Sequence, residues 1–110
     1  MKVPEPYVGK WRIVKMDQWD QEFVDLVVPG HVTIEKSGKG SFQFGAVEAE
    51  MDCRVEEAGK QKRLDLTWDG FDEGDPVSGR GWVQVDGKSM TGHIFFHLGD
   101  DSAFEAKKTR

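Results

Sequence analysis

The chain has 110 residues, of which 37% are hydrophobic and 32% charged, a composition typical of a folded globular protein and not of a disordered one. Its net charge of −5 and its scattered basic residues disfavour nucleic acid and anionic membranes as partners, because both bind clustered lysines and arginines. A single cysteine excludes an internal disulfide, and we find no apolar run that would serve as a signal peptide or cross a bilayer. We therefore expect one domain over residues 1–110, located in the cytoplasm.

The first element in chain order is a strand between Gly9 and Met16. Its sequence, GKWRIVKM, places Trp11 and Ile13 on one face, and this alternation with a period of two is typical of a strand with one buried side. We expect these two side chains to point into a core.

Residues 17–27, DQWDQEFVDLV, break this alternation. Apolar residues recur there at the spacing of one helix face, namely Trp19, Phe23, Leu26 and Val27. Asp17 is the predicted N-cap, Asp20 adds a second acid near the positive helix terminus, and Pro29 with the following glycine ends the helix. The pattern predicts one short helix that packs against the sheet.

From residue 31 onward the alternation returns and predicts further short strands, over residues 31–36, 41–46, 48–57, 63–68, 79–85, 91–99 and 103–108. Glycines and acids mark the predicted turns, at residues 37–40, 59–60, 86–89 and 100–102. Because a long meander with unpaired edges would aggregate, we expect about eight antiparallel strands to close into a small barrel, all-β apart from the helix after the first strand.

A stretch rich in acids, FDEGDPVSGRGW, lies between the predicted fifth and sixth strands. Its acids do not have the spacing of a calcium loop, and its glycines lead into a strand and not into a helix, so no metal and no cofactor is predicted. We expect a loop stiffened by Pro76, in which Gly79 and Gly81 let the backbone approach a neighbour or kink. Arg80 is then predicted to pair with a carboxylate, with these candidates: Asp65, Asp69, Asp72, Asp75 and Asp100.

Several segments resemble those of a family of short, uncharacterised bacterial proteins: SGRGW (Ser78 to Trp82), HIFFHLGDDSAF (His93 to Phe104), DC at Asp52, and WDGFDEGD (Trp68 to Asp75). The resemblance spans most of the chain but implies no activity and no catalytic residue. The GKW at Gly9 is also similar to the G-x-W of lipocalin-like (calycin) barrels, whose tryptophan packs across the barrel bottom. That similarity implies a barrel more than it implies a ligand.

The predicted sixth and seventh strands place a mixed set of residues on one shared face: Arg80, Trp82, Gln84, His93, Phe95 and His97. If this face points outward, it has the composition of a protein interface. If it points inward, it lines a pocket with aromatic walls, as small-molecule sites do. The sequence leaves the two orientations open.

These residues favour a non-catalytic binding or interaction module, with a small-molecule ligand or a second copy in a homodimer as partner. The alternative is a small enzyme with an acid or base among His97, Asp100, Asp69 and Asp72. A shared metal is not expected for His93 and His97, because two residues four apart on a strand are separated by ~13 Å.

Overall fold

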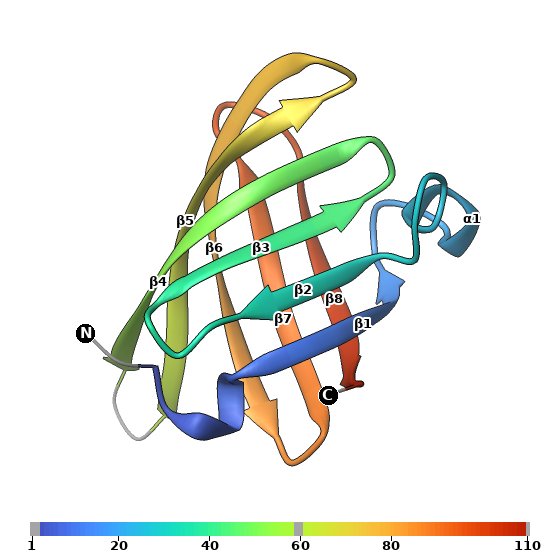
Figure 1. The fold of residues 1–110 in the computed structure, drawn as a ribbon. Helices are drawn as coiled ribbons and strands as arrows, with labels where there is room; N and C mark the ends of the chain where they lie inside the picture. The colour runs from blue at the N-terminus through green and yellow to red at the C-terminus, as the bar shows by residue number, and fades with distance from the viewer. Residues whose placement is uncertain (1–2, 59–60, 110) are drawn as a thin grey trace.

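The computed structural model describes residues 3–58 and 61–109 and shows a closed antiparallel barrel (Figure 1). Its strands are β1 Gly9–Met16, β2 His31–Ile34, β3 Lys39–Phe44, β4 Val47–Ala58, β5 Gln61–Asp72, β6 Asp75–Asp86, β7 Ser89–Phe96 and β8 Asp101–Lys108. Each strand pairs with the next along the chain, and β8 pairs with β1 to close the ring. The predicted all-β fold, with eight strands and one short helix after the first, is confirmed.

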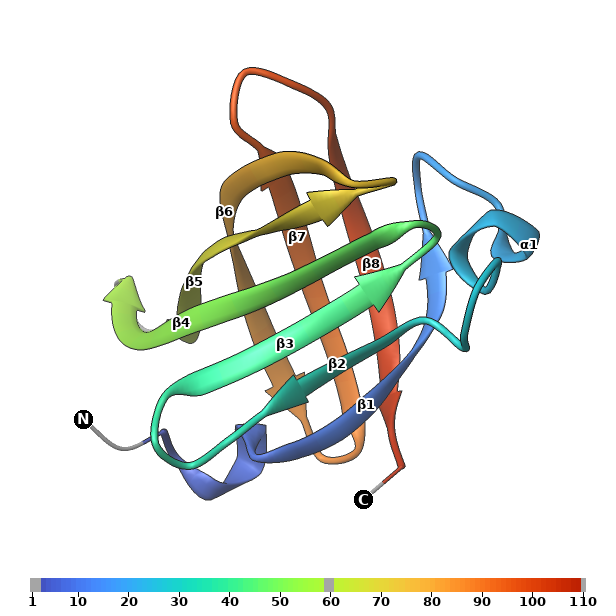
Figure 2. The same cartoon turned by 45° about the horizontal axis from the view of Figure 1, so that its top comes forward.

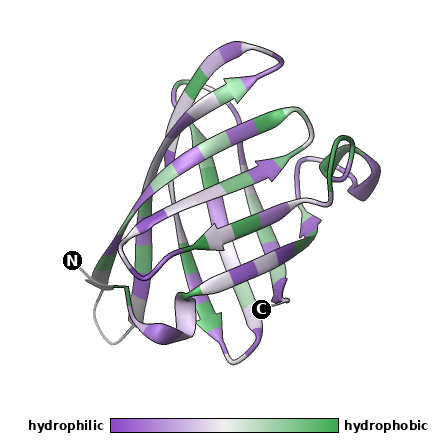
Figure 3. Cartoon of the chain, in the orientation of Figure 1, coloured by the Kyte–Doolittle hydropathy of each residue, from purple (hydrophilic) through white to green (hydrophobic). Residues whose placement is uncertain are grey.

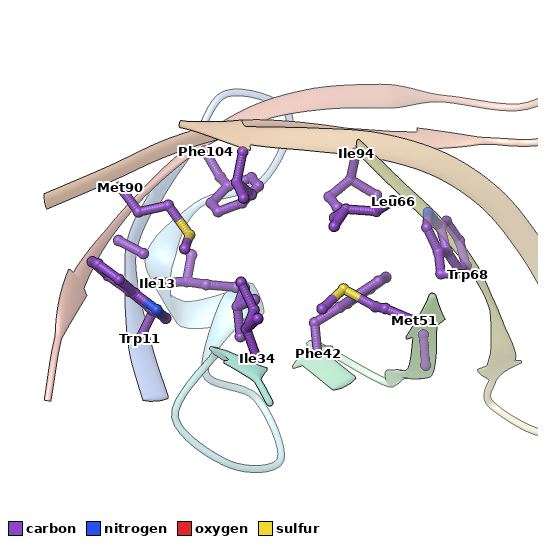
Figure 4. Close-up of a cluster of buried hydrophobic side chains, with 14 of the residues drawn as sticks. Trp11, Ile13, Ile34, Phe42, Met51, Leu66, Trp68, Met90, Ile94 and Phe104 are labelled. Atoms are coloured by element: carbon purple, nitrogen blue, oxygen red, sulfur yellow. The ribbon is translucent and has the colours of Figure 1, made fainter. Parts of the chain in front are cut away.

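The alternation read in the sequence becomes the inside and the outside of this barrel. Figure 3 shows apolar and polar residues following one another along the strands. The apolar set meets in the centre, where Figure 4 shows side chains from strands all around the ring. Trp11 is fully buried, and its indole Nε1 donates to the carbonyl of Tyr7 at 3.0 Å. Tyr7 belongs to a short 3-10 helix, η1 (Glu5–Tyr7), which precedes β1 at this end of the barrel (Figure 1).

The opposite end of the barrel holds a set of touching aromatic rings, which we call the inner aromatic cluster: Trp19, Phe23, Phe42, Phe44, Trp68 and Phe96. The Trp68 ring lies 5.1 Å from the Phe42 ring and 5.0 Å from the Phe96 ring, both near perpendicular. Trp19 joins the cluster from the connection that follows β1. This connection therefore covers the end of the barrel, as the helical pattern predicts.

The helix itself, α1 (Gln21–Val24), is shorter than predicted and begins elsewhere (Figure 2). The N-cap is Asp20 and not Asp17, because the Asp20 carboxylate accepts a hydrogen bond from the Phe23 amide at 2.9 Å. Leu26 and Val27 lie beyond the helix and are exposed by 62% and 61%. The predicted apolar face thus holds for Trp19 and Phe23 but fails for the last two members.

The α1 connection is fixed to β1 by an ion pair. The Arg12 guanidinium lies 2.6 Å from the Asp25 carboxylate, whose other oxygen accepts from the Gly30 amide at 2.8 Å. The hydrogen bond from Arg12, helped by the Gly30 amide and by Gln21, lowers the pKa of Asp25 from 3.8 to about 2. Gln21 also donates to the carbonyl of Ile13. Side chains thus satisfy the Ile13 carbonyl of β1, just beyond the last residue that β2 pairs with.

The acid-rich stretch before Trp82 is a continuous hairpin and not a loop, so this prediction is wrong. β5 runs to Asp72 and β6 starts at Asp75, with only Glu73 and Gly74 between them. Both residues have positive φ, 51° and 87°, as tight two-residue hairpin turns require. Pro76 lies within β6, opposite Phe71.

The close approach predicted for the glycines of this stretch is present. A Cβ at Gly79 would lie 1.8 Å from the carbonyl oxygen of Phe95, and one at Gly81 would lie 2.4 Å from that of His93. Neither position has room for a larger residue unless the backbones of β6 and β7 separate.

The turn after β7 comes earlier than predicted. β7 ends at Phe96, residues 97–100 form the turn, and β8 already begins at Asp101. Leu98, at the tip, has a φ of 57° and is 96% exposed. The predicted turn at residues 86–89 is confirmed by the two residues between β6 and β7. The one at residues 37–40 falls slightly earlier, before Lys39, and the one at residues 59–60 lies outside the described residues.

A buried hydroxyl joins β8 to the connection after β1. Ser102 is 2% exposed and accepts hydrogen bonds from the amides of Asp17 and Gln18, both at 3.1 Å, while it donates to the carbonyl of Ala103.

Within the described part of the chain, no helix has the length and apolar character needed to cross a bilayer.

Candidate functional site: an outer aromatic row

The mixed face of β6 and β7 points outward, which settles the orientation that the sequence leaves open. Val83 and Ile94, on the opposite faces of the two strands, are 0% and 3% exposed and belong to the core. Trp82, His93 and Phe95 are half-buried on the outside. The barrel therefore carries aromatic side chains on both its inner and its outer surface.

The outer side chains form one continuous set, which we call the outer row: Arg63, Trp82, His93, Phe95 and Arg80. The rings of His93 and Phe95 stack with centroids 4.4 Å apart, and Trp82 lies 6.4 Å from His93 with its plane within 26° of parallel. A guanidinium closes each end. Arg63 lies 5.5 Å from the Trp82 ring centre, and Arg80 lies 4.4 Å from that of Phe95.

Register explains why these residues meet. Trp82 is directly opposite His93, and Arg80 is directly opposite Phe95, in the antiparallel pairing of β6 with β7. Cross-strand partners on one face have Cβ atoms about 5 Å apart, so flat side chains there touch without further help. The alternation in the sequence is sufficient to predict the four members on β6 and β7 once these strands are paired, whereas Arg63 reaches the row from β5.

Two carboxylates flank the outer row. His93 Nε2 lies 2.5 Å from Asp101, and Arg63 Nε lies 3.1 Å from Asp65. The Arg63 Nε–H is buried but is not directed at Asp65, so that contact is an ion pair without a hydrogen bond. The row thus carries two guanidinium groups with two carboxylates beside it.

The predicted ion pair of Arg80 is wrong. No carboxylate of the described residues lies within 4 Å of its guanidinium, and its contact is the ring of Phe95. Asp65 instead lies beside Arg63, and Asp101 lies beside His93. Asp69 pairs with Ser78 in the strand register, whereas Asp72 and Asp75 sit at the hairpin tip.

Two members of the predicted face lie outside the outer row. His97 is in the turn after β7, where its amide donates to the carbonyl of Ser78 at 2.7 Å and its side chain is exposed. Gln84 pairs with Thr91 in the register, further along β6 than Trp82. Arg63, Asp101 and Leu98 were missed by sequence reasoning. The signal for Arg63 was its place two residues before Asp65 on an alternating strand.

The four acid–base candidates do not form a hydrogen-bonded set. His97 and Asp100 lie in the turn at residues 97–100, whereas Asp69 and Asp72 lie on β5. Within the described ranges, no hydrogen bond or ion pair joins His97 to any of the three acids. The hydroxyl of Ser102, close to them in sequence, is buried and bound to backbone groups.

Metal-binding and thiol chemistry have little support in this geometry. The described residues contain no group of three or more His, Cys, Asp or Glu that could hold a metal ion. Cys53 is 1% exposed, and burial, with a smaller contribution from the charge of Asp52, raises the pKa of its thiol to about 12. A thiol that stays protonated at neutral pH is a poor nucleophile and ligand.

Open pockets border the outer row. One of about 280 Å³ adjoins Trp82 on the β5 side, and one of about 330 Å³ adjoins Trp82 and His93 on the β8 side. A third, of about 360 Å³, lies between Arg80 and the turn at Leu98. A larger one of about 750 Å³ lies away from the row, over β3, β4 and β5, with several acids in its lining: Glu35, Glu50, Asp52 and Asp69.

No protein-family model, no curated protein and no solved structure is matched by this chain. The resemblances to short bacterial proteins and to lipocalin-like barrels therefore stay predictions from the sequence.

Proposed function

We propose that this protein is a non-catalytic binding module that associates with a second copy of itself through the outer row. The observation that carries the proposal is the ordered stack of Trp82, His93 and Phe95 on the outside of the barrel. Aromatic residues and arginine are enriched at interfaces and among the residues that contribute most to binding energy.

The row is well suited to binding because its side chains are already held in place. Phe95 is in contact with both His93 and Arg80, and His93 is in contact with Asp101. Side chains that are ordered before association lose less conformational entropy when a partner binds. The two open pockets beside Trp82 give a partner's side chains places to insert.

A second copy is favoured over a strongly acidic or basic partner by the charges of this face. The chain carries a net charge of −5, yet this face holds groups of both signs, namely two guanidinium groups and two flanking carboxylates. In a two-fold contact the same surface meets itself, so a patch that holds both signs can pair with its own copy.

The alternatives have less support in the structure. A ligand inside the barrel would compete for space with large side chains that fill it, including Trp11, Phe42 and Phe44. A small enzyme would need its acid and base to meet, and the four candidates are spread over two elements.

The test is sedimentation velocity over a range of concentrations up to millimolar. We expect a dimer that forms with rising concentration, and we expect Trp82→Ala combined with Phe95→Ala to remain monomeric. Phe71→Ala is the matched control, since Phe71 is an aromatic residue exposed by 55% on β5 that makes no ring contact with the row.

Circular dichroism must show that all three proteins are folded. A wild-type chain that stays monomeric throughout, or a double variant that dimerises like the wild type, contradicts the proposal.

A further inference from the structure

The third pocket beside the outer row differs from the others in its chemistry. It has a volume of about 360 Å³ and lies where β6, β7 and the turn at residues 97–100 meet, with this lining: Ser78, Gly79, Arg80, Phe95, Phe96, His97 and Leu98. The turn is held against β6 by the hydrogen bond from the His97 amide to the Ser78 carbonyl at 2.7 Å. The pocket is therefore preformed, and its volume is that of a small-molecule site.

No carboxylate lines this pocket, although the chain has 20 acids and 15 lysines and arginines. The pockets over β3–β5 and on either side of Trp82 all include acids. A pocket beside Lys10 and His31 also has none, but its arginine, Arg12, is neutralised by Asp25 at 2.6 Å. The pocket between Arg80 and Leu98 thus combines a positive charge with a lining free of acids, whereas the pocket that Arg80 borders on its β5 side includes Asp52 and Asp65.

The Arg80 guanidinium is positioned to bind an anion. Its guanidinium lies over the Phe95 ring at 4.4 Å, which fixes the plane of the group. None of the described residues makes an ion pair or side-chain hydrogen bond with it, so its N–H donors remain open. A planar guanidinium binds a carboxylate through two parallel hydrogen bonds.

Besides the polar Ser78 and His97, the lining holds apolar residues, and one of these, Leu98, has an unusual backbone conformation. Leu98 adopts a left-handed backbone conformation, which is unfavourable for a residue other than glycine. Its side chain is nevertheless 96% exposed, so the turn gains no burial of its own from it. With Phe95 and Phe96 it offers apolar surface within the same pocket as Arg80.

We propose that this pocket binds the carboxylate of a small apolar acid, with the carboxylate on Arg80 and the apolar part against Phe95 and Leu98. The same chemistry exists in a free short-chain carboxylic acid and in the C-terminal carboxylate of a peptide that ends in an apolar residue. This inference does not depend on self-association through the outer row.

The experiment is an NMR titration of the ¹⁵N-labelled protein, with hexanoate as the probe. We expect saturable shifts of the amides of Arg80, Phe95, His97 and Leu98. Acetate, which has the charge without the chain, and hexanamide, which has the chain without the charge, should each bind at least about tenfold more weakly, a difference of ~1.4 kcal/mol. Equal affinity for hexanamide overturns the proposal, as does the absence of saturable shifts at these four amides.

Variants identify which residues bind hexanoate. Arg80→Gln should abolish the hexanoate shifts, Arg80→Lys should retain part of the affinity, and Leu98→Ala should weaken binding several-fold. Arg54→Gln is the matched control, because Arg54 is an exposed arginine already 3.3 Å from Asp52. Binding by Arg80→Gln that equals the wild type contradicts the assignment of the carboxylate to Arg80.

Two further measurements are needed. One distinguishes a free acid from a peptide C-terminus as the source of the carboxylate, and the other tests the carboxylate site separately from self-association. N-acetyl-alanyl-leucine with a free C-terminus is compared with its amide, and tighter binding of the free peptide than of hexanoate assigns the site to a chain terminus. Sedimentation of the same samples shows whether the protein dimerises. A monomer that binds hexanoate refutes self-association alone, and a dimer that binds no probe refutes only the carboxylate site.

Discussion

The inner aromatic cluster and the outer row both contain tryptophan and phenylalanine, but their rings are arranged differently. Inside, Trp68 meets Phe42 and Phe96 edge to face at 79° and 84°, and these contacts interlock with stacked pairs such as Phe42 and Phe44 at 14°. Outside, His93 is within 26° of parallel to both of its neighbours, and arginines end the row. Interlocked rings fill a closed volume, whereas a single row on a sheet leaves one side to the solvent. We infer that the first arrangement stabilises the fold and that the second is available to a partner.

The largest expected effect comes from the inner cluster. Trp68→Ala should lower the free energy of unfolding by about 3–5 kcal/mol, because it leaves a cavity among buried rings. It also removes the hydrogen bond from the indole Nε1 to the carbonyl of Arg80 at 3.2 Å. Urea denaturation measures the change. A loss under about 1 kcal/mol would mean that the two aromatic sets do not differ in the way described.

The inner side of β6 offers a second test, since it should tolerate no added volume. Gly79→Ala places a methyl group against the Phe95 carbonyl and should cost about 1–3 kcal/mol. Gly99→Ala serves as the control, because the nearest atom to its Cβ, the Phe96 Cβ, is at 3.2 Å and no positive φ is involved. Similar midpoints for the two variants in the same urea experiment would argue against the close approach of β6 and β7.

The stability that the connection over the inner cluster contributes should decrease at acid pH. The folded-state pKa of Asp25, about 2, lies below the ordinary 3.8 because of Arg12, so its contribution to stability is complete above pH 4 and is lost as the pH falls toward 2. We expect a contribution of about 1–2 kcal/mol, less than the full shift implies because the side chain is 27% exposed. Asp25→Asn should flatten the acid limb of a stability–pH curve. An unchanged limb would show that this ion pair does not hold the connection in place.

The smallest effect on stability is expected in the outer row. Trp82→Ala should cost about 1 kcal/mol or less, because cross-strand contacts on an exposed face contribute only that much. The same urea experiment, run beside Trp68→Ala, measures the contrast directly. If the two substitutions lowered the free energy of unfolding equally, the outer row would be a second core and not a surface for a partner.

The strand order and the inner face could be predicted because alternation decides which side chains share a side. The outer row could be predicted in part for the same reason, since Trp82, His93 and Phe95 hold their places by register alone. Alternation does not report where a hairpin ends. From Asp69 to Ser78 no residue is fully buried, so this stretch of β5 and β6 shows no apolar pattern from which its strands could be predicted.

The remaining errors also have physical causes. Leu98 continues the apolar pattern of β7, but the backbone has already turned at His97, which removes that histidine from the row. The partner of Arg80 was inferred from the abundance of nearby acids. An ion pair depends on distances across the sheet, and at Arg80 the residue directly opposite on β7 is a phenylalanine.

The pairing of β1 with β8 has a consequence for how the barrel assembles. Among the strands described, every other pair joins neighbours in the chain, as a hairpin or, for β1 and β2, through the α1 connection, whereas Trp11 meets Lys108 across almost the whole sequence. Bringing such distant residues together carries the largest loop-closure entropy in the molecule and slows folding in proportion to its share of the contacts. Local pairing can thus build a curved sheet from its hairpins, and the seam between the first and last strands is the step that turns this sheet into a ring.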